Sequence, residues 1–272
     1  MIRPLHFPLL ALLAAAASAQ TLYFSDGRVV PMSPAVRITK DAVNIPLELK
    51  GAAAGEIGLP VSSLARVDWP RPAELDAADA ELKAGRPADA LRKLDPILPL
   101  QQILAEVPGS WWGQAILLRV AALARLDREL DVSVEIERLR RSPANAPLVP
   151  AARIAVATVL AETGKTAQAS ALLAEIDRSG LRDTDLAGLA LVDARLLRAQ
   201  GRHEDALLAC LRVPVLYPAA TRDLPAALLL AAECYRSLDE AARADTALRH
   251  LVEKFPASAE AVRARALLPN NS

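Results

Sequence analysis

The sequence predicts a mainly α protein, an α-α superhelix of about five helical hairpins preceded by a small antiparallel β module. Three observations support this fold class. The 272 residues are 53% hydrophobic but only 3% aromatic, so the apolar fraction rests on Ala, Leu and Val, which favours closely packed helices. The hydrophobic period changes from two to that of helices near residue 70. A turn followed by a small residue then recurs along the rest of the chain.

Residues 1–19 are expected to be a secretory signal peptide. Arg3 precedes an apolar run from Phe7 to Ala17, and residues 17–19 (Ala-Ser-Ala) form a small-residue cleavage site. We predict cleavage after Ala19. An uncleaved membrane anchor is the alternative, although the run is shorter than the ~20 residues that span a bilayer. The mature protein is then expected to be periplasmic or secreted, without a transmembrane segment.

Residues 20–70 are predicted to form the β module, with five or six short antiparallel strands. Val43, Ile45, Leu47 and Leu49 alternate with polar residues or proline, as in a half-buried strand. Shorter alternations cover 36–39 and 66–69, and Asp26-Gly27 supplies a tight turn. Because Pro46 lacks an N–H group, its strand should lie at a sheet edge or present that position outward. The strand lengths resemble those of an SH3-like barrel.

Residues 73–268 are predicted to form the helical repeats. A helix-breaking turn followed five residues later by a small side chain begins at Gly85, Gly164 and Gly201, with weaker copies at Asp127 and Asp239. The small residues are separated by 42, 37, 37 and 38 residues, which is long enough for two helices of three to four turns. We expect them to lie where paired helices touch, so that larger side chains would overpack the contact. These residues are Ala90, Val132, Ala169, Ala206 and Ala244.

The repeats resemble the tetratricopeptide repeat (TPR) family. In the last unit, Tyr235, Ala244 and Pro256 match the aromatic, small and terminating positions of that repeat in register. The fourth unit matches at Ala206 and Pro218, whereas the first two units are degenerate. The resemblance spans residues 73–268 and is strongest at the end. It implies a helical superhelix whose first helices line a concave groove.

The resemblance also implies which residues face that groove. An apolar line edged with arginine suits an extended or helical peptide that carries acidic groups. The alternative is that the leucines belong to the hairpin cores and the arginines to the solvated surface. The Lys and Asn clamp of chaperone-binding family members does not appear at these positions. The apolar line is Leu117, Ile154, Leu191 and Leu229, with Arg125, Arg195, Arg198, Glu233 and Arg236 nearby.

The pair Trp111-Trp112 is a conspicuous local feature. Ser110 is expected to be the N-cap of a helix that begins here, so that the two indoles project about 100° apart. We favour packing of one indole against the preceding unit or the β module. The functional alternative is an aromatic binding platform at Trp111 or Trp112.

The remaining composition limits the chemistry. Lys and Arg total 32 and Asp and Glu total 32, without like-charge blocks, which argues against nucleic-acid binding. The common nucleotide, zinc, acyl-transfer and thiol-redox motifs are absent from the sequence. We therefore predict no enzymatic activity, no cofactor and no metal site. Cys210 and Cys234 are expected to be buried apolar side chains, with a disulfide as the alternative.

Together these features predict an exported, non-catalytic scaffold or adaptor that binds a protein or peptide partner in the cell envelope. Periplasmic members of the family that the last unit resembles assist outer-membrane assembly or coordinate envelope constriction in cell division, and a related role is implied here. Two alternatives stay open. One is a self-associating structural protein of the envelope, and the other is an enzyme with an unrecognised site.

Overall fold

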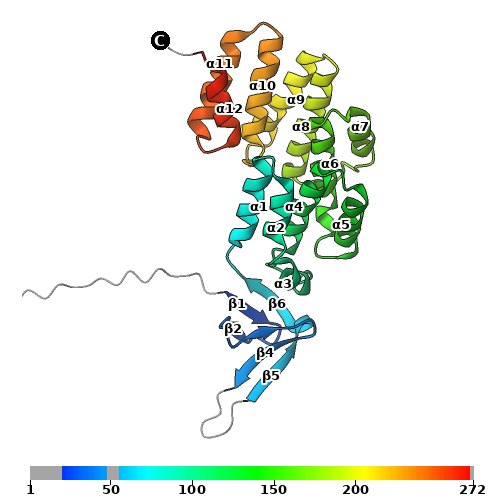
Figure 1. Ribbon diagram of the computed structural model, residues 1–272, viewed down its shortest axis with the longest axis vertical. Coiled ribbons are helices and arrows are strands. Elements are labelled where there is room, and N and C mark those ends of the chain that lie inside the picture. Colours follow the sequence, from blue (N-terminus) through cyan, green and yellow to red (C-terminus); the bar gives the residue numbers. More distant parts are fainter. Residues whose placement is uncertain (1–19, 48–54, 270–272) are drawn as a thin grey trace, which may run out of the picture. The chain divides into compact units, whose positions relative to one another are not determined.

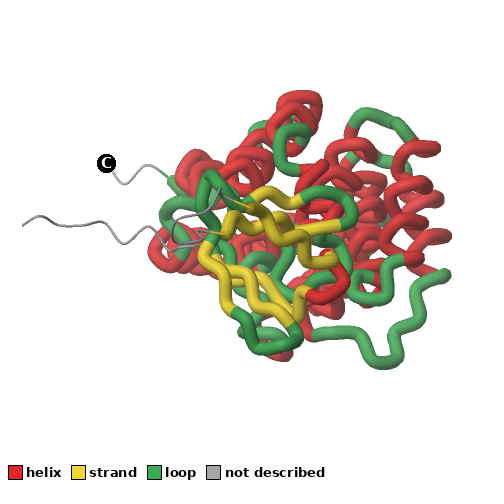
Figure 2. Tube along the Cα trace, turned by 90° about the horizontal axis from the view of Figure 1, so that it is seen from below, coloured by secondary structure: helices red, strands yellow, loops and turns green. Residues whose placement is uncertain are grey.

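A computed structural model describes residues 20–47 and 55–269. These residues divide into two compact units. The N-terminal unit ends at Arg71 and also includes Val107–Ser110, and the helical unit contains the rest of the chain from Pro72 onward. The described structure is mainly helical, as predicted, and its strands all belong to the N-terminal unit (Figures 1 and 2). The predicted signal peptide lies outside the described residues. Where the chain is described, none of its helices combines the length and apolarity needed to cross a membrane.

Two three-stranded antiparallel sheets make up the N-terminal unit, which agrees with the prediction of five or six short antiparallel strands. Each sheet is built around one central strand, β1 or β4, and the likeness to an SH3-like barrel stays a prediction. The first sheet has the order β2-β1-β6, formed by Thr21–Phe24 (β1), Val29–Pro31 (β2) and Leu64–Asp68 (β6). The second has the order β3-β4-β5, formed by Arg37–Ile38 (β3), Ala42–Leu47 (β4) and Gly55–Pro60 (β5).

Two local predictions for these strands can be compared with the structure. Gly27 has φ +87° in the turn between β1 and β2, so the predicted tight turn is present. The strand that contains Pro46 lies in the middle of its sheet, so the edge-strand form of the expectation is wrong and the alternative, an outward-facing Pro46, agrees with the structure. However, β3 pairs only with Val43 and Asn44, and Pro46 itself is exposed and pairs with Glu56 alone. The short neighbour strand therefore leaves Pro46 without a ladder partner on that side.

Five consecutive pairs of packed helices form most of the described helical unit: α1 with α2, α4 with α5, α6 with α7, α8 with α9, and α10 with α11. The first helices of neighbouring pairs also contact one another, as α4 does α6 and α6 does α8. The short α3 and the terminal α12 stand outside the pairs. The bounds are Ala73–Lys83 (α1), Pro87–Leu94 (α2), Leu98–Ile103 (α3), Trp112–Arg125 (α4), Glu129–Arg141 (α5), Val149–Glu162 (α6), Thr166–Ala174 (α7), Asp183–Ala199 (α8), His203–Leu216 (α9), Leu224–Ser237 (α10), Ala241–Lys254 (α11) and Ala259–Leu267 (α12).

The same turn joins the two helices of every pair. In the first pair, Gly85 has φ +74° and its N–H donates to the Leu82 carbonyl, while the Arg86 N–H donates to the Glu81 carbonyl. This arrangement is the Schellman motif, in which a left-handed residue ends a helix and satisfies its last carbonyls. The two repeats with weak sequence copies share it, because aspartate takes the left-handed position there. The left-handed residues are Gly85, Asp127, Gly164, Gly201 and Asp239.

We predict that Asp239→Gly raises the free energy of unfolding by about 0.5–1 kcal/mol. Asp239 has φ +60°, a conformation that strains any residue with a Cβ atom but not glycine. Asp239→Ala is the matched control and should lower the stability instead, because alanine keeps the strain and lacks a polar group that can bond locally. Urea denaturation of both variants measures the difference. A shift in the same direction for both would contradict the explanation.

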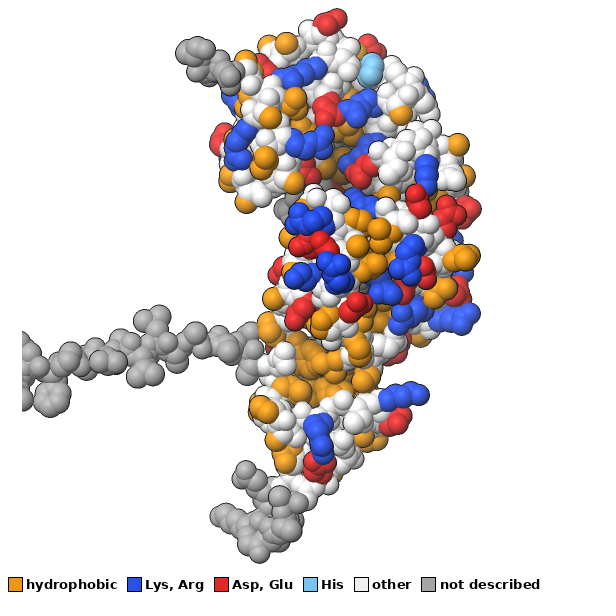
Figure 3. All heavy atoms as spheres, in the orientation of Figure 1, with side chains coloured by type: hydrophobic (Ala, Val, Ile, Leu, Met, Phe, Trp, Pro, Cys, Tyr) orange, Lys and Arg blue, Asp and Glu red, His pale blue; other side chains and the backbone are white. Residues whose placement is uncertain are grey.

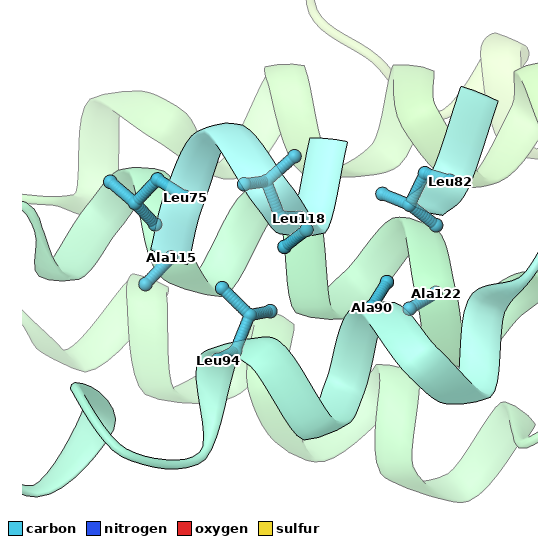
Figure 4. Close-up of a cluster of buried hydrophobic side chains, with 8 residues drawn as sticks. Leu75, Leu82, Ala90, Leu94, Ala115, Leu118 and Ala122 are labelled. Carbon is cyan, nitrogen blue, oxygen red and sulfur yellow. The ribbon is translucent and has the colours of Figure 1, made fainter. Parts of the chain in front are cut away.

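The predicted small residues lie in the cores of the pairs. Ala90, Ala169, Ala206 and Ala244 are fully buried, and Val132 is 7% exposed. Figure 4 shows Ala90 in a cluster with Leu75 and Leu82 of α1, Leu94 of α2 and side chains of α4. A side chain no larger than valine at this position lets the second helix approach the first, so the predicted role of these residues agrees with the packing.

Candidate functional site

A hollow of about 420 Å³ opens between α6, α8, α10 and α12, and we call it the groove pocket. Four residues that the repeat register assigned to a concave groove line it: Arg195, Arg198, Leu229 and Glu233. Its lining is partly apolar, with small or aliphatic side chains, and partly charged, with both signs. We call the apolar lining residues the floor (Ala161, Ala199, Ala226, Leu229 and Leu230) and the charged lining residues the rim (Glu162, Arg195, Arg198, Glu233, Glu260 and Arg263).

Two glutamates organise the rim. Glu162 at the end of α6 accepts a hydrogen bond from Arg125 of α4, with 3.2 Å between Nη2 and Oε2, and its Oε1 lies 3.4 Å from Nη2 of Arg195. Glu233 of α10 pairs with Arg198 of α8. The Nη2 atom of Arg263 on α12 also lies 3.5 Å from the Glu233 carboxylate. Each of the two glutamates therefore contacts arginines from two different helices.

These ion pairs change the expected character of the groove. The sequence predicted an arginine edge open to an acidic ligand, but the arginines already have partners within the chain. The lining contains three arginines and three glutamates, so the pocket is balanced rather than basic. Figure 3 shows the same mixture of charges over the visible face of the helical unit. Such partly exposed pairs contribute little stability and can exchange partners at low cost.

Most of the predicted apolar line is buried instead of exposed to a ligand. Ile154 is 7% exposed and Leu191 is 4% exposed, each inside a core cluster, and Leu117 packs against the cluster around Trp112. Only Leu229 among them also lines the groove pocket. The physical reason is that neighbouring first helices pack directly against one another, which covers this position.

Arg236 also departs from the expected groove. It lies near the end of α10 and donates a hydrogen bond to the carbonyl oxygen of Leu267. Its guanidinium is 3.5 Å from the carboxylate of Asp245 on α11. These contacts direct the side chain toward α11 and the end of α12, and Arg236 is not among the residues that line the pocket.

Both tryptophans of the pair Trp111-Trp112 pack against core clusters of the helical unit. Trp112 is 1% exposed and its Nε1 atom donates to Oε1 of Gln102 at 3.1 Å. Trp111 is half-buried and packs against the cluster that contains Leu75. The alternative of an aromatic binding platform at Trp112 is therefore wrong, because Trp112 is a core residue. The N-cap expected at Ser110 is also wrong, because Trp111 occupies that position and its N–H donates to the side chain of Gln101 at 2.7 Å.

Three charged lining residues were not predicted: Glu162, Glu260 and Arg263. The sequence carried a signal for the first, because Glu162 follows Arg125 by 37 residues, the same interval that separates the later repeats. The other two lie on α12, beyond the last predicted hairpin. These three residues could have been located by comparing the charged residues at equivalent positions of every repeat, and by continuing the comparison beyond Pro256.

A second hollow of about 430 Å³ lies on the other side of α8, against α9. Asp193, Arg202, Asp205 and Arg212 contribute charges to it. Burial raises the pKa of Asp193, and the positive charges of Arg178 and Arg212 oppose that rise. In the described part of the chain, no group of His, Cys, Asp and Glu side chains is arranged to hold a metal ion.

The arrangement of the groove pocket suits the binding of a polar chain rather than a single charged group. It offers an apolar floor for side chains, arginine N–H groups for carbonyls or carboxylates, and glutamates for N–H groups or cations. Neither the scan against protein-family models nor the comparison with curated proteins finds a match for this chain.

Proposed function

We propose that this chain is an exported, non-catalytic scaffold of five TPR-like hairpins that binds an extended segment of an envelope protein in the groove pocket. The observation that carries the proposal is the pocket itself. The repeat register located four of its lining residues from the sequence, and the helices α6, α8, α10 and α12 present an apolar floor with a rim of both charges there.

The floor and the rim support a peptide in different ways. Ala161, Ala199 and Ala226 have short side chains, so a bound backbone can approach the helices closely. The rim pairs then act as exchangeable partners, because Arg198 can leave Glu233 for a carboxylate or carbonyl of the ligand. The glutamate that is freed can accept from an N–H group or pair with a basic side chain. Specificity would therefore depend on the order of charges along the partner segment.

Export is part of the proposal and rests on the features of residues 1–19. A basic residue, an apolar run and a small-residue cleavage site occur there in the order that a secretory signal requires. The partner is accordingly expected in the cell envelope or outside the cell.

Peptide selection tests this function. The full chain would be used to select binders from a displayed library of random peptides, and synthetic copies would be measured by calorimetry. Ala199→Trp adds a bulky side chain to the pocket lining without removing an ion pair, so we expect it to weaken binding about tenfold, equivalent to roughly 1.4 kcal/mol. Ala242→Trp, at an exposed position of α11 outside the pocket, is the matched control. Selected peptides that bind Ala199→Trp as tightly as the control would contradict the proposal.

A further inference from the structure

Two cysteines face each other across neighbouring helices of the helical unit. Cys210 lies on α9 and Cys234 on α10, and these helices pack against one another. Both residues are 0% exposed, and each thiol is the chief influence on the pKa of the other, which requires that the two side chains lie close together. They therefore form a buried pair rather than two isolated apolar side chains.

The packing around the pair allows close approach. Cys210 shares its core cluster with Ala194, Ala209 and Ala231, so small residues from three helices surround it. A disulfide needs Cα atoms about 4.4–6.8 Å apart, and helices whose axes lie about 8–10 Å apart bring their nearest Cα atoms into that range. Alanines at the contact favour the closer end of this spacing.

The two thiols differ in acidity in the folded chain. The hydrogen bond from Cys210 and the nearby charge of Arg198 lower the pKa of Cys234, against the opposing effects of burial and Glu233. The same hydrogen bond, followed by burial, raises the pKa of Cys210. This difference belongs to the folded chain, in which both thiols are buried; while α9 and α10 are still apart, either thiolate can attack first.

We propose that Cys210 and Cys234 are a disulfide-forming pair that an external disulfide oxidises during folding. The thiolate of either cysteine attacks one sulfur of R–S–S–R, and one R–S⁻ leaves with its electron pair and takes up a proton. The other cysteine then loses its proton and attacks the mixed disulfide, which releases the second R–S⁻. The products are one protein disulfide and two R–SH, so the external disulfide is the species reduced.

Burial determines when this reaction happens. Because neither thiol is exposed in the folded chain, exchange requires that α9 and α10 are still apart. The finished bond joins the fourth helix pair to the fifth, next to Arg198 and Glu233 of the groove pocket. It also closes a loop in the unfolded chain, which stabilises the folded state relative to the unfolded one. This inference stands independently of the proposed peptide binding.

Oxidative refolding tests the proposal. The full chain would be reduced, unfolded in guanidinium and refolded in a mixture of reduced glutathione and glutathione disulfide, then alkylated and digested with trypsin. The expected product is a disulfide between the peptides 203–212 and 223–236, each of which carries one cysteine, with neither thiol alkylated. Alkylation of both cysteines, or a separate glutathione adduct on each, would overturn the proposal.

Serine variants supply the controls. Cys210→Ser and Cys234→Ser each keep one sulfur and should show a glutathione adduct or a free thiol but no internal bond. The oxidised wild type should melt roughly 5–10 °C above its reduced form, as loop closure predicts for a chain of this size. The double variant should melt at the same temperature in both buffers. An equal shift in the double variant would overturn the assignment of the stabilisation to this bond.

Discussion

Replacing Trp112 by alanine is expected to lower the free energy of unfolding of the helical unit by about 3–5 kcal/mol. The indole is 1% exposed and lies in the core cluster with Ile116, Leu139 and Ala152, which come from three helices. Alanine would leave a cavity between them that the surrounding helices can close only in part. Urea denaturation of the full chain, followed by far-ultraviolet circular dichroism, measures the loss.

Polar contacts surround one edge of the indole. The Gln102 side-chain oxygen accepts from the Trp112 indole and from Arg138, whose guanidinium lies 5.8 Å from the indole ring centroid. Arg138 in turn pairs with Glu135, which is only 5% exposed, at 2.8 Å. Loss of the indole removes one donor from Gln102. Because Gln102 is exposed and the Arg138 side chain is 39% exposed, water can replace the lost donor, and the cavity alone sets the expected value.

Trp111→Ala is the matched control for this prediction. It removes the same side chain from the adjacent position, but Trp111 is half-buried and packs at the border of its cluster. Its loss should cost no more than about half as much, because less apolar surface leaves the core. A Trp111 variant as unstable as the Trp112 variant would contradict the assignment of Trp112 as the core residue.

The helix pairs were predictable from the sequence because their signals are local. A left-handed residue is needed to reverse the chain after the first helix, and glycine at Gly85, Gly164 and Gly201 marks it directly. Asp127 and Asp239 meet the same need less visibly, since aspartate tolerates this conformation. The buried alanine five residues later follows from the same geometry. A hydrophobic period and a turn residue therefore suffice to locate such hairpins.

Features that depend on distant contacts were not predictable in this way. Ser110 has the chemistry of an N-cap, yet the side chain of Gln101, ten residues earlier, accepts the hydrogen bond at the start of α4. The segment Val107–Ser110 belongs to the N-terminal unit although it lies between two helices in sequence. No local pattern distinguishes these arrangements from their alternatives.

In the candidate site, too, the features set within one repeat were predictable and those set by contacts between repeats were not. The repeat register placed Arg195, Arg198, Leu229 and Glu233 at one surface, and they line one pocket. The register could not show that Ile154 and Leu191 are covered by the adjacent first helices, because that contact joins different repeats. For the same reason, it missed the pairing of Arg198 with Glu233, which lie 35 residues apart. Charge balance in a groove of this kind depends on neighbouring repeats considered together.

Gly109→Ala is expected to destabilise the N-terminal unit by about 2–5 kcal/mol. Gly109 has φ +87°, which alone disfavours any residue with a Cβ atom. In addition, a Cβ atom at this position would lie 1.9 Å from the carbonyl oxygen of Val67 on β6. That oxygen belongs to backbone, so it cannot rotate away as a flexible side chain would. The Val67 N–H also donates to the Pro108 carbonyl at 2.8 Å, which holds the two segments together.

Gly27→Ala provides a control that separates strain from contact. Gly27 has the same φ of +87°, but a Cβ atom there would meet nothing within 4 Å. Its cost should be only the ~1–2 kcal/mol of the left-handed conformation. Amide hydrogen exchange adds a local measurement, because the Val67 N–H should lose protection in Gly109→Ala and keep it in Gly27→Ala. Equal costs for the two variants, with Val67 still protected in both, would show that the approach of Val107–Ser110 to β6 does not limit residue 109 to glycine.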